Sequence, residues 1–231
     1  NDLAAAPGKN VIKLWEGLGY YARCRNLHAT AKIIATEKKG IFPNTYEELI
    51  HLKGIGPYTA AAIASFAYNI PKAVIDGNVI RVLSRFFGIT DPVDKTNTKK
   101  EIAILAQNCL DEKDPASYNQ AIMDFGATVC KPVNPSCNVC DFQKLCYAHN
   151  HEATHHLPYF EKKLKKKNRW IIFFLITYKN KIAIHQRSSG DIWAGLYDFP
   201  SHSFSSKAEL DKFLNKLSPE NIKVVFNTPI T

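Results

Sequence analysis

The sequence contains no apolar run long enough to cross a membrane. The longest, Trp170 to Thr177, has eight residues, whereas a membrane-spanning helix needs roughly 18 to 20. No charged segment followed by an apolar one opens the chain, so no secretory signal is recognisable. We therefore expect an intracellular protein with no membrane partner.

Methionine is nearly absent, with Met123 its one occurrence, and the chain opens at Asn1. It stops at Thr231, directly after a segment that resembles a strand, and we expect a fragment at both ends. The 231 residues are 45% hydrophobic, which suffices for a sizeable core and suggests two modest domains. No internal repeat is visible.

Net charge carries little information about the folded parts. The formal charge is +9, but the stretch EKKLKKKNR at 161–169 holds six basic residues and one acid, a net of +5. Only +4 remains for all other residues. We interpret the stretch as a solvated linker, with a phosphate-binding segment as the alternative.

The hydrophobic pattern changes at this linker. Up to His149 it is helical, with helices expected at Lys9 to Glu16 and at Arg23 to Glu37, where Leu27 and Ile34 share the inward face. After Trp170 the pattern predicts two strands, a turn between them and a helix from Ser206 to Leu217. Thr45 and Asp114 are expected to cap the helices that follow them.

Two helices are expected to meet at a glycine turn in LKGIGPYTAAAIASFAYNIPKAVIDGNV. Gly54 and Gly56 allow a sharp turn and a close approach to another molecule, and Pro57 suits the first turn of the second helix. Free amide groups at a helix start bind phosphate without a basic side chain. An ordinary helix-turn-helix connection is the alternative.

An aspartate follows in the stretch Val74 to Val79, VIDGNV. Asp76 can cap the helix expected from Asn78 to Phe86. It can also be a partly buried carboxylate that a helix N-terminus aims into a cleft. The two roles are compatible.

Four cysteines are clustered in CKPVNPSCNVCDFQKLC, with gaps of six, two and five residues. In a reducing compartment, Cys130, Cys137, Cys140 and Cys146 are metal ligands more often than disulfide partners. Four thiolates can hold either zinc or an iron–sulfur cluster, and the spacing alone does not decide between them. Isolated Cys24 and Cys109 are expected to be packed thiols.

Several of these motifs together resemble a known family. Leu52 to Ala60 and Asp76 to Val79 resemble the helix-hairpin-helix and catalytic aspartate of the DNA glycosylase superfamily that includes endonuclease III. WEGLGYYARCRNL (Trp15 to Leu27) and MDFGA (Met123 to Ala127) resemble the MutY-type adenine DNA glycosylases. The motifs occur in the family's order and run over nearly the whole chain.

The resemblance implies an α+β protein. An all-α helix-hairpin-helix glycosylase domain is expected at 1–129, an iron–sulfur loop at 130–149, a basic linker at 150–169, and a partial Nudix-like α/β domain that recognises 8-oxoguanine at 170–231. The four clustered cysteines would hold a [4Fe–4S] cluster. The Nudix-like part has no glutamate-rich metal helix, so pyrophosphatase activity is not expected, and Trp193 is expected to pack in its core.

The implied reaction is monofunctional removal of adenine from pairs with 8-oxoguanine or guanine in duplex DNA. The adenine is flipped into a pocket, and two carboxyl groups divide the work of protonating the base and stabilising the sugar cation. Asp76 matches the second carboxyl group, and Asn78 would position sugar or water. Tyr58 occupies the place of the nucleophilic lysine of endonuclease III-like lyases, so lyase activity is not expected.

The expected DNA contacts include Tyr20, which matches a tyrosine that wedges into the base stack. The full set is Tyr20, Arg23, Arg25, Gly54, Gly56, Thr59, Lys131 and Lys144. The glutamate that matches the first carboxyl group lies upstream of Asn1 in the family, and Glu16 does not replace it. We therefore expect the fragment itself to bind DNA poorly and to be inactive.

The resemblance further implies a monomer that works at the bacterial nucleoid in the cytoplasm, or in the nucleus or mitochondria of a eukaryote. Two alternatives stay open. An endonuclease III-like glycosylase with lyase activity is disfavoured by Tyr58 and by the second domain. A non-catalytic zinc-containing DNA-binding protein would have a colourless metal site.

Overall fold

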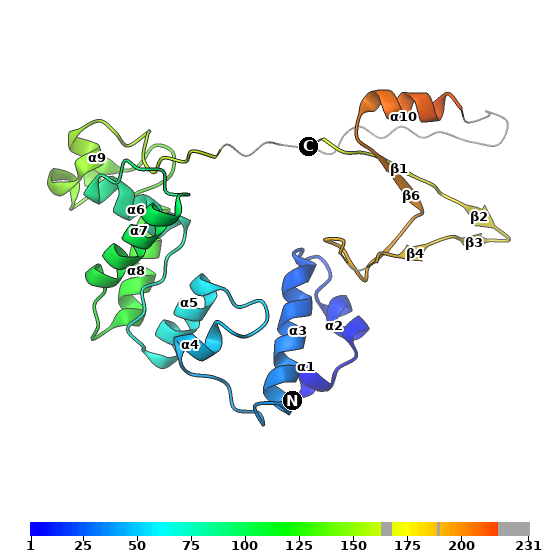
Figure 1. Ribbon diagram of the computed structural model, residues 1–231, viewed down its shortest axis with the longest axis horizontal. Coiled ribbons are helices and arrows are strands. Elements are labelled where there is room, and N and C mark those ends of the chain that lie inside the picture. Colours follow the sequence, from blue (N-terminus) through cyan, green and yellow to red (C-terminus); the bar gives the residue numbers. More distant parts are fainter. Residues whose placement is uncertain (163–167, 189, 217–231) are drawn as a thin grey trace. The chain divides into compact units, whose positions relative to one another are not determined.

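A computed structural model describes residues 1–162, 168–188 and 190–216 (Figure 1). The chain divides into two compact units, residues 1–163 and 164–231. The first is helical and the second contains the strands, as the change of pattern predicts. In the described part of the chain, no helix is long and apolar enough to span a bilayer.

The helical unit is a succession of short helices joined by turns. They are α1 (Asp2–Ala5), α2 (Gly8–Leu14), α3 (Tyr21–Thr36), α4 (Tyr46–Leu49), α5 (Pro57–Tyr68), α6 (Gly77–Phe87), α7 (Thr96–Cys109), α8 (Pro115–Thr128), the 3₁₀ helices η1 (Cys137–Val139) and η2 (Gln143–Leu145), and α9 (Tyr147–Asn150). Thr45 accepts a hydrogen bond from the Glu48 amide, and Asp114 accepts one from the Ser117 amide. Both expected caps are therefore present.

Two apolar clusters hold the helices together. One, built on Val79, Leu83 and Ile102, joins α6 to α7. The other, built on Leu49 and on the alanines of α5, joins α4 to α5. Because alanine side chains are small, they let the two helices of the hairpin pack closely.

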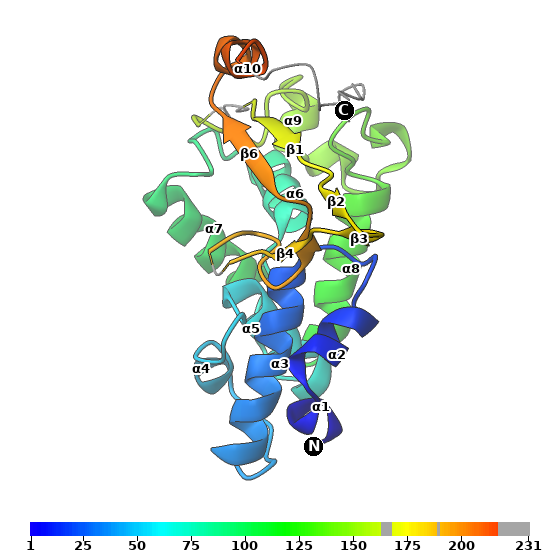
Figure 2. The same cartoon turned by 90° about the vertical axis from the view of Figure 1, so that its right-hand side faces the viewer.

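Helix α3 packs on α1 and α2 and also contacts the hairpin (Figure 2). The Thr30 hydroxyl donates a hydrogen bond of 2.8 Å to the carbonyl of Lys53. Helix α3 buries Cys24 and His28 on the face that meets α2, and Thr30 on another face that meets the hairpin. Leu27, which the sequence pattern places inward, is 48% exposed. The expectation for Leu27 is wrong because its position on the helix lies between these two contact faces.

The first part of the expected linker is attached to the helical unit. The amide of Val93 bonds to the carbonyl of Tyr159 at 2.8 Å, and Asp94 accepts the amides of Glu161 and Lys162 at 3.0 Å each. The lysine-rich residues 163–167 lie outside the described residues.

In its described residues, the second unit contains three antiparallel strand pairs. They are β1 (Trp170–Phe173) with β6 (Ser201–Phe204), β2 (Thr177–Tyr178) with β3 (Lys181–Ile182), and β4 (His185–Gln186) with β5 (Tyr197–Asp198). Figure 2 shows β1 beside β6, where Trp170 is opposite Phe204. The expected turn at Lys179 and Asn180 is present, and both residues have positive φ.

Helix α10 (Lys207–Leu214) completes the described part of this unit. Ser206 caps it by accepting the amide of Glu209, and Phe213 packs against Phe204 with ring centroids 5.2 Å apart. The expected end of this helix at Leu217 lies outside the described residues.

Candidate active site

The glycine turn between α4 and α5 has the geometry that its sequence suggests. Gly54 has φ +80, and a Cβ there would lie 2.5 Å from Cβ of Asn26, so only glycine fits. Gly56 is the N-cap of α5 and no side chain caps this helix. Tyr58 is 47% exposed in the first turn, next to half-buried Thr59. The amides of this turn are therefore placed to bind an anion from solvent.

Asp76 sits at the start of α6 with both carboxylate oxygens bonded. Oδ1 accepts the amide of Val79 at 2.8 Å, which is an N-cap bond. Oδ2 accepts the side-chain amide of Asn78 at 2.9 Å. The carboxylate is half-buried and is held in one orientation by two donors, in addition to the positive end of the helix dipole.

Arg81 links this pair to the cysteine loop. Its Nη2 donates to Oδ1 of Asn78 at 2.8 Å and to the carbonyl of Gly126 at 2.7 Å, and its Nε donates to the carbonyl of Cys130 at 2.8 Å. Arg81 is 8% exposed, and burial lowers the pKa of its guanidinium from the ordinary value. Gly126 belongs to the MDFGA motif, and a Cβ there would lie 2.7 Å from Cβ of Asn78. The two motifs thus meet at Asn78.

The loop before α3 displays Tyr20. The Trp15 indole donates a hydrogen bond of 2.8 Å to the carbonyl of Gly19 and so braces the loop. Tyr20 has φ +47, an uncommon conformation for this residue type, and its side chain is 80% exposed. Arg23 is exposed in the first turn of α3, whereas Arg25 is half-buried. An exposed ring on a braced loop is suited to contact with a partner molecule.

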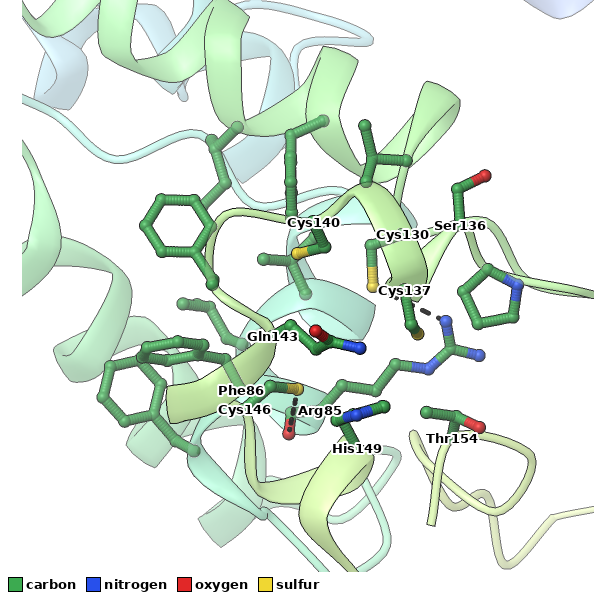
Figure 3. A pocket seen from close by; sticks show the side chains of 18 of the residues that line it. Arg85, Phe86, Cys130, Ser136, Cys137, Cys140, Gln143, Cys146, His149 and Thr154 are labelled. Atoms are coloured by element: carbon green, nitrogen blue, oxygen red, sulfur yellow. Dashed lines mark hydrogen bonds between the residues drawn. The ribbon is translucent and has the colours of Figure 1, made fainter. Parts of the chain in front are cut away.

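The four clustered cysteines line one cavity of about 420 Å³ (Figure 3). Arg85 crosses this site: its Nη1 lies 3.5 Å from Sγ of Cys130, and its carbonyl accepts the thiol of Cys146 at 3.5 Å. Burial raises the pKa of the Cys137 thiol, and the neighbouring cysteines raise it further. The four sulfurs therefore share one small region of the fold.

The donor set distinguishes between kinds of metal site. Zinc needs its thiolates about 2.3 Å from a single ion. Among the described residues, no three histidine, cysteine or acidic side chains are close enough to hold one ion. The four thiols line one cavity together, and the nearby guanidinium of Arg85 can offset the negative charge of thiolates. Four thiolates are the donor set that an iron–sulfur cluster requires.

The remaining expected DNA contacts flank this cavity. Lys131 is half-buried and its carbonyl accepts a hydrogen bond of 2.7 Å from Arg85, whereas Lys144 is exposed in η2. Within the described residues no hydrogen bond joins Tyr58 to Asp76. Glu16 is exposed and pairs with Lys13, as expected for a surface carboxylate.

Sequence reasoning missed the arginines of α6. Arg81 and Arg85 follow Asn78 by three and seven residues, so all three lie on one face of the helix. Charged residues that repeat at this spacing beside buried Val79 and Leu83 were a usable signal for a polar network.

In the second unit, Arg187 organises the loop that carries Trp193. It forms ion pairs with Asp191, at 2.6 Å, and with Asp198, and its guanidinium lies 5.0 Å from the centroid of the Trp193 ring. Trp193 is 46% exposed. The expectation that it packs in the core is therefore wrong: one face of the ring meets a cation at the surface.

The helices around Asp76 are similar to those of a known class of repair proteins. Residues 1–112 match the HhH-GPD superfamily base excision DNA repair protein. The solved structure of a thermostable thymine-DNA glycosylase is similar over 65% of this chain and 69% of its own, with a TM-score of 0.60 and 27% identity. The helical unit therefore has the HhH-GPD glycosylase fold.

The sequence relatives are more specific. The adenine DNA glycosylase of Buchnera aphidicola subsp. Baizongia pistaciae (strain Bp) is 36% identical over 206 residues, which are 87% of this chain and 57% of the relative. The adenine DNA glycosylase of Rattus norvegicus is 46% identical over 149 residues, 64% of this chain and 29% of the relative. The chain thus spans little more than half the length of the Buchnera protein. These relatives confirm the resemblance to adenine DNA glycosylases.

Proposed function

We propose that this chain carries the helical domain of a DNA repair glycosylase that removes adenine paired with 8-oxoguanine or guanine. The observation that carries the proposal is the doubly bonded carboxylate of Asp76 at the start of α6, in the same unit as an uncapped helix-hairpin-helix turn. The names of the sequence relatives support adenine as the base.

In the proposed reaction, the bond between the sugar and N9 of adenine breaks and its electron pair leaves with the base. Positive charge builds up on the sugar, and the Asp76 carboxylate stabilises it. The side-chain amide of Asn78 holds that carboxylate in place. Water then adds to the sugar, which leaves an abasic site. Tyr58 has no amine and cannot form a Schiff base, so strand cleavage by a lyase step is not part of the proposal.

The departing adenine needs a proton, and we assign its delivery to a second carboxyl group. The hydrogen bonds of Asp76 and Asn78 in the described residues involve no other carboxyl group. We propose that the carboxyl group that delivers the proton lies outside this hydrogen-bond network.

DNA would be held mainly through its backbone. The glycine turn before α5, with Gly54 and Gly56, and the first turn of α5, with Thr59, offer amide donors to a phosphate. Tyr20 would enter the base stack beside the flipped adenine. Arg23, Arg25, Lys131 and Lys144 are the proposed cationic contacts.

We further propose that Cys130, Cys137, Cys140 and Cys146 hold a [4Fe–4S] cluster. When bound, such a cluster would fix the loop that carries Lys131 and Lys144, and it would supply no step of the hydrolysis. The shared cavity and the donor from Arg85 support this assignment.

The second unit is proposed to be part of a Nudix-like domain that recognises the base opposite adenine. The similarity to the Buchnera adenine DNA glycosylase extends over 206 residues, which is more than the 163 of the helical unit. The proposed protein acts as a monomer on duplex DNA, either at the bacterial nucleoid or in the nucleus or mitochondria.

The test is alkali-revealed strand cleavage at the adenine of an 8-oxoguanine:adenine duplex. It is run on this chain and on a hybrid extended at the N-terminus by the corresponding part of the Buchnera relative. We expect the hybrid to release adenine and its Asp76→Asn variant to release it at least about 100-fold more slowly. Cleavage without alkali would favour an endonuclease III-like lyase, and binding without adenine release by either protein would favour a non-catalytic DNA-binding protein.

A further inference from the structure

Residues 71–74 lead to Asp76, and two amide side chains form hydrogen bonds with their backbone. Gln107 accepts the amide of Ala73 at 3.1 Å and donates to the carbonyl of Pro71 at 3.0 Å. Asn119 accepts the amide of Val74 at 3.0 Å and donates to the carbonyl of Lys72 at 2.9 Å. Each amide thus bonds the backbone of residues i and i+2, as a neighbouring strand would.

Asn119 makes one bond more than Gln107. Its Nδ2 also donates to the hydroxyl of Ser65 on α5 at 2.9 Å. Asn119 is 1% exposed, Ser65 is 0% exposed and Val74 is 1% exposed, so the bonds to Ser65 and Val74 are buried, while the bond to Lys72 is partly buried. One buried amide therefore joins α8, the second helix of the hairpin and the residue two positions before Asp76.

We propose that Asn119 is a positioning residue that fixes Asp76 relative to α5, the helix that would bind the DNA backbone. This inference rests on the proposed function. The reaction requires the carboxylate at a set place beside the flipped nucleotide, and that place is defined by where the hairpin holds the phosphates. A displacement of about 1 Å can slow an oriented reaction by roughly 100-fold.

Two substitutions and one control test this proposal. Asn119→Asp keeps the shape and the acceptor for Val74 but replaces the donors to Lys72 and Ser65 with an oxygen. Ser65→Ala removes only the bond to α5 and leaves both backbone bonds. Val11→Ala, in a buried position of α2, is the control for lost stability alone.

The experiment measures single-turnover adenine release and duplex affinity of the N-terminally extended hybrid, at a temperature where circular dichroism shows every variant folded. We expect Asn119→Asp to slow release by between about 10-fold and 100-fold. Ser65→Ala should have a smaller effect of the same kind, and Val11→Ala should match the wild-type rate. Duplex affinity should be unchanged in all three. An unchanged rate in folded Asn119→Asp, or a rate that falls only as affinity falls, would overturn the proposal.

A second measurement does not depend on activity. The amide of Val79 bonds to Asp76, so its hydrogen exchange in this chain reports how firmly the carboxylate is placed. Faster exchange at Val79 in Asn119→Asp, with unchanged exchange in α2, is the expected result, and equal exchange at Val79 would refute positioning. If the wild-type hybrid releases no adenine, the proposed function fails while this measurement still decides the role of Asn119.

Discussion

The side-chain amide of Asn78 donates a hydrogen bond of 2.9 Å to Oδ2 of Asp76. The other oxygen of the same carboxylate accepts the amide of Val79. One oxygen of Asp76 therefore caps α6, and the other accepts the hydrogen bond from Asn78. A substitution that keeps the cap but removes the negative charge can separate the structural role of Asp76 from its proposed catalytic role.

Asp76→Asn is the first prediction. Asparagine caps helices about as well as aspartate, so the melting temperature should change little. Adenine release by the hybrid should fall by at least about 100-fold, because an amide carries no charge to stabilise the sugar cation. Asp114→Asn is the matched control, since Asp114 caps α8 in the same manner. Equal activity in the two variants would remove Asp76 from the mechanism.

The two glycines of the hairpin should respond differently to alanine. At Gly54 the new Cβ meets Asn26 and the backbone is left-handed, so Gly54→Ala should lower the unfolding free energy by about 1 to 3 kcal/mol. At Gly56 nothing lies within 4 Å of the new Cβ, so stability should be retained. Gly56→Ala should still weaken duplex binding by about 1 kcal/mol or more, because the new Cβ keeps a phosphate from approaching the backbone amides closely. Thermal melts and binding titrations at fixed salt separate the two effects.

Gly126→Ala should disturb Asn78 directly. Its Cβ would lie 2.7 Å from Cβ of Asn78 and 3.2 Å from the Asn78 backbone, and backbone cannot move aside as a flexible side chain can. We expect a loss of about 1 to 3 kcal/mol in stability. Gly77→Ala is the control, because nothing lies within 4 Å of its Cβ. Similar melting curves for the two variants would contradict the described contact.

Metal analysis tests the cysteine site. The purified protein should contain iron and absorb visible light, and Cys137→Ser should lose most of the iron. Cys109 lines the same cavity but is not one of the four proposed ligands, so the Cys109→Ser variant should retain its iron. A colourless protein with one zinc per chain would establish a zinc site instead.

Asp94 gives a pH prediction. Hydrogen bonds from the amide of Glu161, together with that of Lys162, lower the pKa of Asp94 from 3.8. Its contribution to stability is therefore complete above about pH 4 and is lost as the pH falls through the lower, folded-state pKa. The amide resonances of Glu161 and Lys162 should shift over that acidic range, and Asp94→Asn should abolish the shift. A shift centred above pH 4 would show that these bonds do not favour the carboxylate.

Local features of the fold could be predicted from the sequence, and long-range ones could not. Thr45, Asp76 and Asp114 each cap a helix by accepting the amide of the residue three positions later, so residues close in the sequence specify each cap. Arg81 bonds a carbonyl 49 residues away, and Asn119 bonds an amide 45 residues away. No local pattern specifies such partners, since they depend on how α6, α7 and α8 pack.

The same limit explains the two wrong expectations for side-chain burial. Leu27 has the right helical spacing to be buried, but the placement of α2 and of the hairpin decides which faces of α3 are covered. Trp193 is large and apolar, yet the ion pairs of Arg187 with Asp191 and Asp198 set its surroundings.

The left-handed backbone of Tyr20 sets a limit on how stable this protein can become. A residue with a Cβ is strained in that conformation by about 1 kcal/mol or more, whereas glycine is not. Replacement by glycine would relieve that strain and remove the one exposed ring that the loop presents. At this position a search for thermostable variants would therefore favour the substitution that removes the proposed DNA contact. At Asp76, by contrast, the residue that suits folding also suits catalysis.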